Sequence, residues 1–253
     1  MVGLQTAGRR PPPSPQRLTA GSPAWADSIA DRFLEALLAG DRELALRLAD
    51  RAVEMGHAVA DVHVHVLQQA MVRIGQLWET GRISVAAEHT ATAIVQFVVT
   101  ALYPRMQRSD AVRGQAVVAG VAGESHQLGA HLVSDALEAD GWQVRFLGAD
   151  CPQGTILGVC LQARPALLAL SCTMTGNLPR LAQLIAALRR QPAGAPLPRI
   201  LVGGQAFGSG PQARQRALQL GADELALDLH GAVAAARLLT PPPAPRAMTI
   251  AGC

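Results

Sequence analysis

The chain has 253 residues, about half of them apolar, which is enough for one large domain or two modest ones. The net charge of +3 is too small to indicate nucleic-acid binding by itself. Every basic residue is an arginine, which excludes a phosphate-loop lysine and Schiff-base chemistry at lysine. We find no apolar stretch of the about 20 residues that a membrane helix needs and no signal pattern, so we expect a cytoplasmic protein.

The two ends of the chain are rich in proline. Residues 1–23 include Arg9, Arg10 and three consecutive prolines, and we predict that they form a disordered basic arm. Residues 241–253 begin with three more prolines and are predicted to be a flexible tail.

Residues 24–108 have the periodicity of helices, with apolar side chains recurring every three or four positions. Gly40, Gly56 and Gly81 stand where these runs stop, as expected of residues that end helices. Four helices joined by such short turns predict a helix bundle.

The pattern changes over residues 114–240, where short β-branched runs alternate with helical runs. Five strands alternating with five helices predict a flavodoxin- or Rossmann-like, doubly wound parallel sheet, so the whole chain is predicted to be α plus α/β. Ligands of such sheets bind outside the carboxyl ends of the strands. The loops after the first, third and fourth strands are therefore the candidates for chemistry.

The loop after the first predicted strand contains the sequence Glu124-Ser-His126-Gln-Leu-Gly129. An imidazole at the carboxyl edge of the sheet can project towards a ligand. Glu124 can accept a hydrogen bond from its other ring nitrogen, which fixes the tautomer and raises the basicity of the histidine. Gly129 leaves room for a bulky group close to the backbone. Taken alone, a histidine of this kind is more often an ordinary surface residue.

Two further loops belong to the same predicted edge. Ser171 and Thr173 follow the third strand, and Gly203 and Gly204 follow the fourth. Small hydroxyl residues and paired glycines predict a deep slot lined by hydrogen-bonding groups and backbone. Each pair is ordinary by itself, as a strand end or a tight turn, but the three loops in this order are much less so.

This set of loops resembles the cobalamin-binding fold shared by methionine synthase and its relatives, over about residues 115–238. The resemblance implies that His126 is the lower axial ligand of cobalt, in place of the dimethylbenzimidazole base, and that Glu124 is its partner. The family usually has aspartate at that position. The cofactor-binding residues implied in this domain, several of them lining the channel for the displaced nucleotide tail, are Glu124, Ser125, His126, Gln127, Leu128, Gly129, Ser171, Thr173, Gly203 and Gly204.

The helical region carries a second motif, because Trp78 is followed ten positions later by Glu88 and His89. This arrangement resembles the light-sensing cobalamin proteins of the CarH type, in which the tryptophan lies over the corrin and the Glu-His pair adjoins the upper adenosyl group. An indole offers a flat apolar surface, and the pair can hydrogen-bond a ribose. The alternative is that Trp78 belongs to the core and the pair to a helix surface.

The CarH type also carries an N-terminal winged-helix DNA-binding domain of the MerR class, for which residues 1–23 are too short. We therefore expect no specific DNA binding by this chain. Residues 24–108 would cap the upper corrin face, and this organisation resembles the AerR antirepressors of purple photosynthetic bacteria. Those proteins bind cobalamin and act on a separate repressor of the CrtJ/PpsR type.

The sequence thus predicts a light-responsive regulator that is not an enzyme. Its expected cofactor is adenosylcobalamin or the aquo or hydroxo photoproduct, and its expected partner is a DNA-binding repressor, with no membrane contact and with oligomers possible. The main alternative is the corrinoid carrier subunit of a methyltransferase. A mutase subunit is less favoured, since its substrate barrel of about 250 residues has no counterpart in this sequence.

Overall fold

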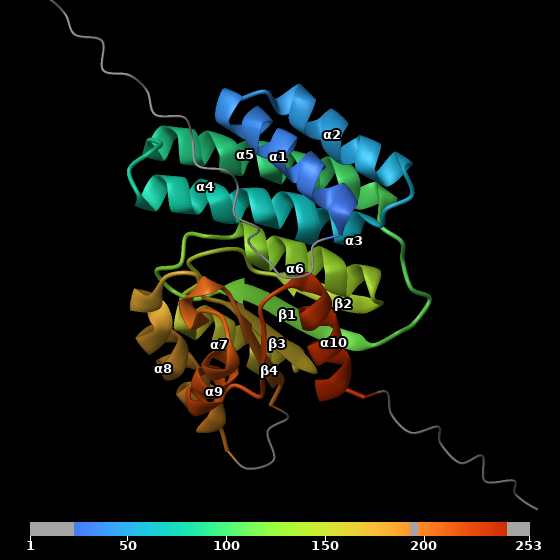
Figure 1. Ribbon diagram of the computed structural model, residues 1–253. Helices are drawn as coiled ribbons and strands as arrows, with labels where there is room; N and C mark the ends of the chain where they lie inside the picture. The colour runs from blue at the N-terminus through green and yellow to red at the C-terminus, as the bar shows by residue number, and fades with distance from the viewer. Residues whose placement is uncertain (1–22, 193–196, 242–253) are drawn as a thin grey trace, which may run out of the picture.

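The computed structural model describes residues 23–192 and 197–241. Within these residues a helical cap precedes a five-stranded parallel sheet with helices on both faces (Figure 1), as the sequence predicts. Apart from Pro23 and Pro241, the segments predicted as a basic arm and a flexible tail lie outside the described residues.

The cap consists of four helical rods. The first ends at Gly40, whose φ of 69° is left-handed, and Asp41 caps the second by accepting a hydrogen bond from the Leu44 amide at 2.8 Å. The third rod contains a π-helical segment between two α-helical ones, and Ser84 caps the fourth. The bounds are α1 (Ala24–Ala39), α2 (Arg42–Glu54), α3 (Val59–Val62), η1 (His63–Gln68), α4 (Gln69–Glu79) and α5 (Val85–Leu102).

The helix α5 corrects one expectation from the sequence. By length and composition, the segment Val85–Arg105 could cross a membrane, with a mean hydropathy of 1.4, so the statement that no stretch is long enough was wrong. The buried side of α5, including Ile94 and Val98, packs with Phe33 of α1 in the core of the cap. The contact of this side with the core accounts for part of the apolar composition, while Val85 and Phe97 lie exposed.

The sheet has the strand order β2-β1-β3-β4-β5, and all its strands are parallel. This is the flavodoxin-like order. After β2 is placed on one side of β1, the later strands are added on the other side, so the order of addition reverses at β1. Gly120 pairs with Ser171, and Ser171 pairs with Gly203, so β1, β3 and β4 end at the same level. The bounds are β1 (Gly114–Gly120), β2 (Trp142–Phe146), β3 (Leu167–Ser171), β4 (Arg199–Gly203) and β5 (Glu224–Ala226).

Alternate side chains of the strands enter two different cores, as the pleat of a strand requires. Val117 and Ala119 face α7 (Gln153–Ala163), α8 (Leu178–Arg189) and α9 (Pro211–Gln219). Ala116 and Val118 face α6 (Leu128–Ala139) and α10 (Leu229–Leu239) on the opposite side of the sheet. Both faces are therefore buried, which explains the continuous apolar runs in the sequence.

The cap lies over α6, which separates it from the sheet (Figure 1). Leu132 and Ala136 of α6 belong to the same hydrophobic cluster as the cap helices. The Tyr103 hydroxyl also donates a hydrogen bond to Glu138 of α6 at 2.5 Å. In the view of Figure 1, the turn between α4 and α5 lies on the same side of the molecule as the carboxyl ends of the strands.

Candidate functional site

The carboxylate of Glu124 is the centre of the site at the carboxyl edge of the sheet. It is fully buried, and five donors serve its two oxygens. Oε1 accepts from the backbone amide of His126 at 3.1 Å and from its Nδ1 at 2.5 Å. Oε2 accepts from the amides of Thr173 and Met174 at 2.7 and 2.9 Å and from Nδ2 of Asn177 at 3.2 Å.

These donors decide the charge of Glu124. Burial acts to raise the pKa of this carboxyl group, because it disfavours the charged form. The hydrogen bonds from the Met174 amide, the His126 ring and the Thr173 amide outweigh burial and hold the pKa below its ordinary value. Glu124 is therefore a buried carboxylate anion at neutral pH, and such an anion can orient a histidine that ligates a metal.

His126 is fixed by this anion at one ring nitrogen only. The hydrogen bond to Glu124 assigns the proton to Nδ1, while Nε2 makes no hydrogen bond to the described residues. The side chain is 45% exposed, so the free nitrogen remains accessible from solvent. An imidazole held at Nδ1 by a carboxylate and open at Nε2 is suited to ligate a metal ion from outside the fold.

The loops after β1 and β3 meet as the sequence predicts, and Thr173 reaches Glu124 through its backbone amide. The role predicted for the hydroxyl side chains of Ser171 and Thr173, which is to line a channel for the nucleotide tail, stays a prediction. Ser171 is partly buried at the end of β3, and its carbonyl accepts a hydrogen bond from the Val121 amide at 3.3 Å. The contribution of this loop that the structure shows is therefore a pair of N–H donors aimed at a carboxylate.

The glycines of the site differ in what they require. Gly204 has a φ of 105°, and a Cβ there would lie 2.3 Å from the Cys172 carbonyl oxygen, so no other residue fits. A Cβ on Gly203 would lie 2.8 Å from the Ala226 carbonyl oxygen. Gly129 has open space around it in the first turn of α6. A restriction at Gly129 would therefore have to come from a bound ligand.

Asn177 is a member of the site that sequence reasoning missed. It is buried with 6% of its surface exposed, and its Nδ2 donates both to Glu124 and to the Gly123 carbonyl oxygen at 3.1 Å. Its position in a short 3-10 turn before α8 has no distinctive sequence signal. The contact joins residues 53 positions apart, so only the tertiary structure reveals it.

The other predicted residues of the His126 loop lie on the surface around it. Ser125 and Gln127 are exposed, and Leu128, the first residue of α6, is half-buried against the cluster that contains the cap core. These three residues border the imidazole along the chain, and the structure gives them no hydrogen bond through their side chains to the described residues.

The residues predicted for the upper side form a separate group at the turn between α4 and α5. Trp78 is 41% exposed, so the alternative that it belongs to the core is wrong. Glu88 holds His89 through a 2.5 Å contact with Nδ1 and accepts a hydrogen bond from Thr92 at 2.8 Å. Among the described residues, no hydrogen bond connects this group to the loop of His126.

These observations define a class of protein: a helical cap over a flavodoxin-like sheet that presents a carboxylate-backed histidine at its carboxyl edge. The donor set fits a corrinoid, since an accessible imidazole nitrogen suits cobalt and the buried anion raises its basicity. The residues that would hold the cofactor are His126 at the metal and the backbone around Gly203 and Gly204 beside it.

Comparison with known proteins agrees with this class. Residues 29–103 and residues 114–229 each match a family model described as a B12 binding domain. The two matches together span most of the chain, which belongs to a cobalamin-binding family and carries a cobalamin or corrinoid cofactor site.

Three relatives illustrate the range of this family. The chain is 32% identical over 123 residues to the HTH-type transcriptional repressor CarA of Myxococcus xanthus, covering 49% of this chain and 41% of CarA. It is 23% identical over 155 residues to trimethylamine corrinoid protein 1 of Methanosarcina acetivorans, covering 60% and 72%. The solved structure of the Methanosarcina barkeri monomethylamine corrinoid protein superposes with a TM-score of 0.72 at 21% identity, covering 83% and 97%.

The last of these similarities supports the fold alone. The chain spans less than half the length of CarA, so the function of that whole repressor does not transfer with the match. A regulator and corrinoid proteins are both among the relatives, and they leave the choice between these two roles to the residues of the site.

Proposed function

We propose that this chain is a cobalamin-dependent, light-responsive transcriptional regulator of the antirepressor type. It acts through a separate DNA-binding repressor and catalyses no reaction of its own. The proposal rests mainly on one observation: an exposed indole, Trp78, and a hydrogen-bonded Glu88–His89 pair flank the turn between α4 and α5.

On the lower side, the chain's own residues supply a ligand in a fixed state. Glu124 keeps the Nδ1 proton of His126 in place, so Nε2 would be the atom that holds cobalt when the cofactor is bound. The five donors on Glu124 keep that carboxylate from turning away. Because β1, β3 and β4 end at one level, the three loops act as a single rigid support.

On the upper side, a bound alkylcobalamin supplies a cobalt–carbon bond that visible light can break. Trp78 offers an apolar surface to the upper group, and Glu88 and His89 offer a hydrogen-bond acceptor and a ring nitrogen. Contacts between that group and these three residues would favour one position of the α4–α5 turn, and without the group that preference would be absent. The cap shares a core with Leu132 and Ala136 of α6, so a shift of the cap changes the surface that a partner contacts.

The alternative function is the corrinoid carrier of a methyltransferase, which the similarity to the trimethylamine corrinoid protein supports. A carrier must expose the upper face of the cofactor to its partner enzyme. A bulky Trp78 at the end of α4 and the paired Glu88 and His89 at the start of α5 are features suited to hold an upper group rather than to release it. For this reason we favour the regulator.

The deciding experiment is the visible spectrum of the purified protein with adenosylcobalamin, first in darkness and then after green light. We expect a bound adenosyl form that light converts irreversibly to an aquo or histidine-ligated form. His126→Ala should lose the base-off, histidine-on spectrum, and His230→Ala, an exposed histidine of α10, is the matched control. Retention of only methyl or reduced cobalamin, without a lasting light effect, would instead favour the carrier.

The partner requires its own test. A repressor of the CrtJ/PpsR type should co-purify with the cobalamin-loaded chain in one light state and less in the other. The chain alone should give no sequence-specific shift of promoter DNA. Equal recovery of the repressor in both light states would contradict the regulatory step, even where the light-driven spectral change occurs.

A further inference from the structure

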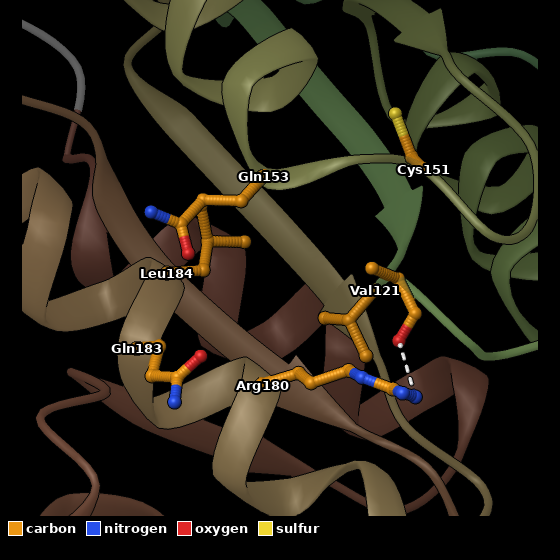
Figure 2. A pocket seen from close by; sticks show the side chains of 7 residues that line it. Val121, Cys151, Gln153, Arg180, Gln183 and Leu184 are labelled. Atoms are coloured by element: carbon orange, nitrogen blue, oxygen red, sulfur yellow. Dashed lines mark hydrogen bonds between the residues drawn. The ribbon is translucent and has the colours of Figure 1, made fainter.

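A cavity of about 220 Å³ opens at the carboxyl edge of the sheet, on the side of α7 and α8 (Figure 2). This is the face opposite the one that α6 and the cap cover. Val121 and Leu184 form apolar parts of its wall, and the polar groups are Arg180, Gln153 and Gln183. The cavity is therefore small, rich in N–H donors and separate from the side of the sheet where the cap lies.

Arg180 brings a positive charge to this cavity without a negative partner. Its Nη1 donates to the Asn177 amide oxygen at 2.9 Å and to the Ala122 carbonyl oxygen at 3.5 Å, and both acceptors are neutral. Within the described residues no carboxylate lies within ion-pair distance of it, in contrast to Arg113, which pairs with Asp140. A guanidinium and two side-chain amides that line one cavity form a donor set that suits an anionic oxygen group.

The same arginine is connected to the metal-binding histidine by three hydrogen bonds in series. Arg180 donates to Oδ1 of Asn177, Nδ2 of Asn177 donates to Glu124 at 3.2 Å, and Glu124 holds Nδ1 of His126. Because Oδ1 faces the guanidinium, the amide of Asn177 must present its N–H group to Glu124. Arg180 and the Gly123 carbonyl oxygen, which accepts from Nδ2 at 3.1 Å, together fix the orientation of a side chain that holds Glu124.

Gly123 shows how closely these groups are packed. A Cβ at this position would lie 1.9 Å from Nη1 of Arg180 and 3.0 Å from Oδ1 of Asn177. In Figure 2 the guanidinium points towards the Ala122 carbonyl and away from the amides of Gln153 and Gln183. An anion bridging the guanidinium and those amides would therefore draw Nη1 away from Asn177.

We propose that this cavity binds a small carboxylate or phosphate anion and that its occupancy weakens the binding of cobalamin through Arg180, Asn177 and Glu124. The coupling rests on the proposed cobalamin function, whereas the anion site itself does not. Withdrawal of Arg180 removes the donor that positions Oδ1 of Asn177. The Nδ2 group is then held only by Glu124 and the Gly123 carbonyl oxygen, and the hydrogen bond that holds Glu124 against His126 weakens. Weakening one hydrogen bond corresponds to a change of about two- to tenfold in affinity. By thermodynamic reciprocity, cobalamin weakens anion binding by the same factor.

The first arm of the test uses the cofactor-free chain. Inorganic phosphate and succinate are titrated separately at constant ionic strength, with chloride as the control, and amide chemical shifts are followed by NMR. We expect a saturable shift of the Gln153 and Gln183 side-chain amides with at least one of the two probes, and the comparison tells phosphate from carboxylate. Arg180→Gln should abolish it. Arg216→Gln is the matched control, because Arg216 also donates to a neutral carbonyl oxygen but lies outside the cavity.

The second arm measures the affinity for aquocobalamin from the visible spectrum, with and without the probe that bound. We expect the dissociation constant to rise about two- to tenfold with the probe in the unmodified chain. Arg180→Gln should bind cobalamin more weakly from the start and be insensitive to the probe. Since Arg180 is exposed, its variant should fold, which the thermal unfolding midpoint checks.

The outcomes separate the parts of the argument. Absence of a saturable amide shift, or an unchanged shift in Arg180→Gln, overturns the anion site. Anion binding with an unchanged affinity for cobalamin overturns the coupling. Failure to bind any cobalamin overturns the proposed function together with the coupling, and the NMR result still decides the anion site.

Discussion

His63 offers the most direct test of how the cap is packed. It lies in the π-helical segment η1, is 0% exposed, and neither ring nitrogen has a hydrogen-bond partner among the described residues. Burial, followed by the positive charge that His131 can carry, lowers the pKa of His63 from 6.5 to about 4. At neutral pH the chain therefore contains a neutral imidazole that has lost its hydrogen bonds to water and forms none with the described residues.

Replacing this residue by leucine, which has a similar volume, should stabilise the protein. A buried polar group without a partner costs about 1–3 kcal/mol, so His63→Leu should raise the free energy of unfolding by about that amount at pH 7. The unfolded chain protonates His63 below pH 6.5, whereas the folded chain does so only near pH 4. The wild-type chain therefore loses stability as the pH falls from 6.5 to 4, by about 3 kcal/mol from this residue alone.

The variant lacks this loss, so its advantage over the wild type should grow by about 3 kcal/mol between pH 7 and pH 4. Denaturant unfolding of the cofactor-free chain at several pH values measures it. Asp135, whose pKa burial raises to about 6, acts in the opposite direction in both proteins and so cancels in the difference. His65→Leu, in the same segment but partly exposed, is the control. A stability difference that stays constant from pH 7 to pH 4 would refute the reasoning.

Three further predictions concern the site and the contact between the cap and α6. Glu124→Gln should lower cobalamin affinity about 10- to 100-fold in a spectroscopic titration, and Glu124→Asp should retain most of it, because the anion orients the ligand histidine; equal affinities would contradict that role. Gly129→Ala should leave the unfolding midpoint nearly unchanged and yet weaken cobalamin binding, because the space around Gly129 is open in the cofactor-free chain. Gly204→Ala should prevent folding, since a Cβ there has no space. Unchanged cobalamin affinity in Gly129→Ala would show that no ligand passes close to Gly129. Tyr103→Phe should cost about 1 kcal/mol in denaturant unfolding by removing the hydrogen bond to Glu138, and no loss would mean that this contact does not hold the cap.

The sequence by itself determined the two-part architecture and the place of His126 at the carboxyl edge of the sheet. Periodicity separates the helical cap from the alternating strands and helices, because it reflects which side chains each element must bury. Parallel strands place the loops after β1, β3 and β4 at one edge, so His126 and Glu124 could be assigned before any coordinates. These features depend on local spacing, which the chain carries explicitly.

Only the tertiary structure decided which donors hold Glu124 and that the buried ring of His63 has no hydrogen-bond partner among the described residues. The donors from Thr173 and Met174 are backbone amides, which every residue except proline possesses and no sequence pattern marks. Asn177 and Arg180 reach the site by folding back over about 50 residues, and their roles depend on which atoms meet. Which side chains contact one another depends on how the helices and strands pack together, and the local sequence does not specify that packing.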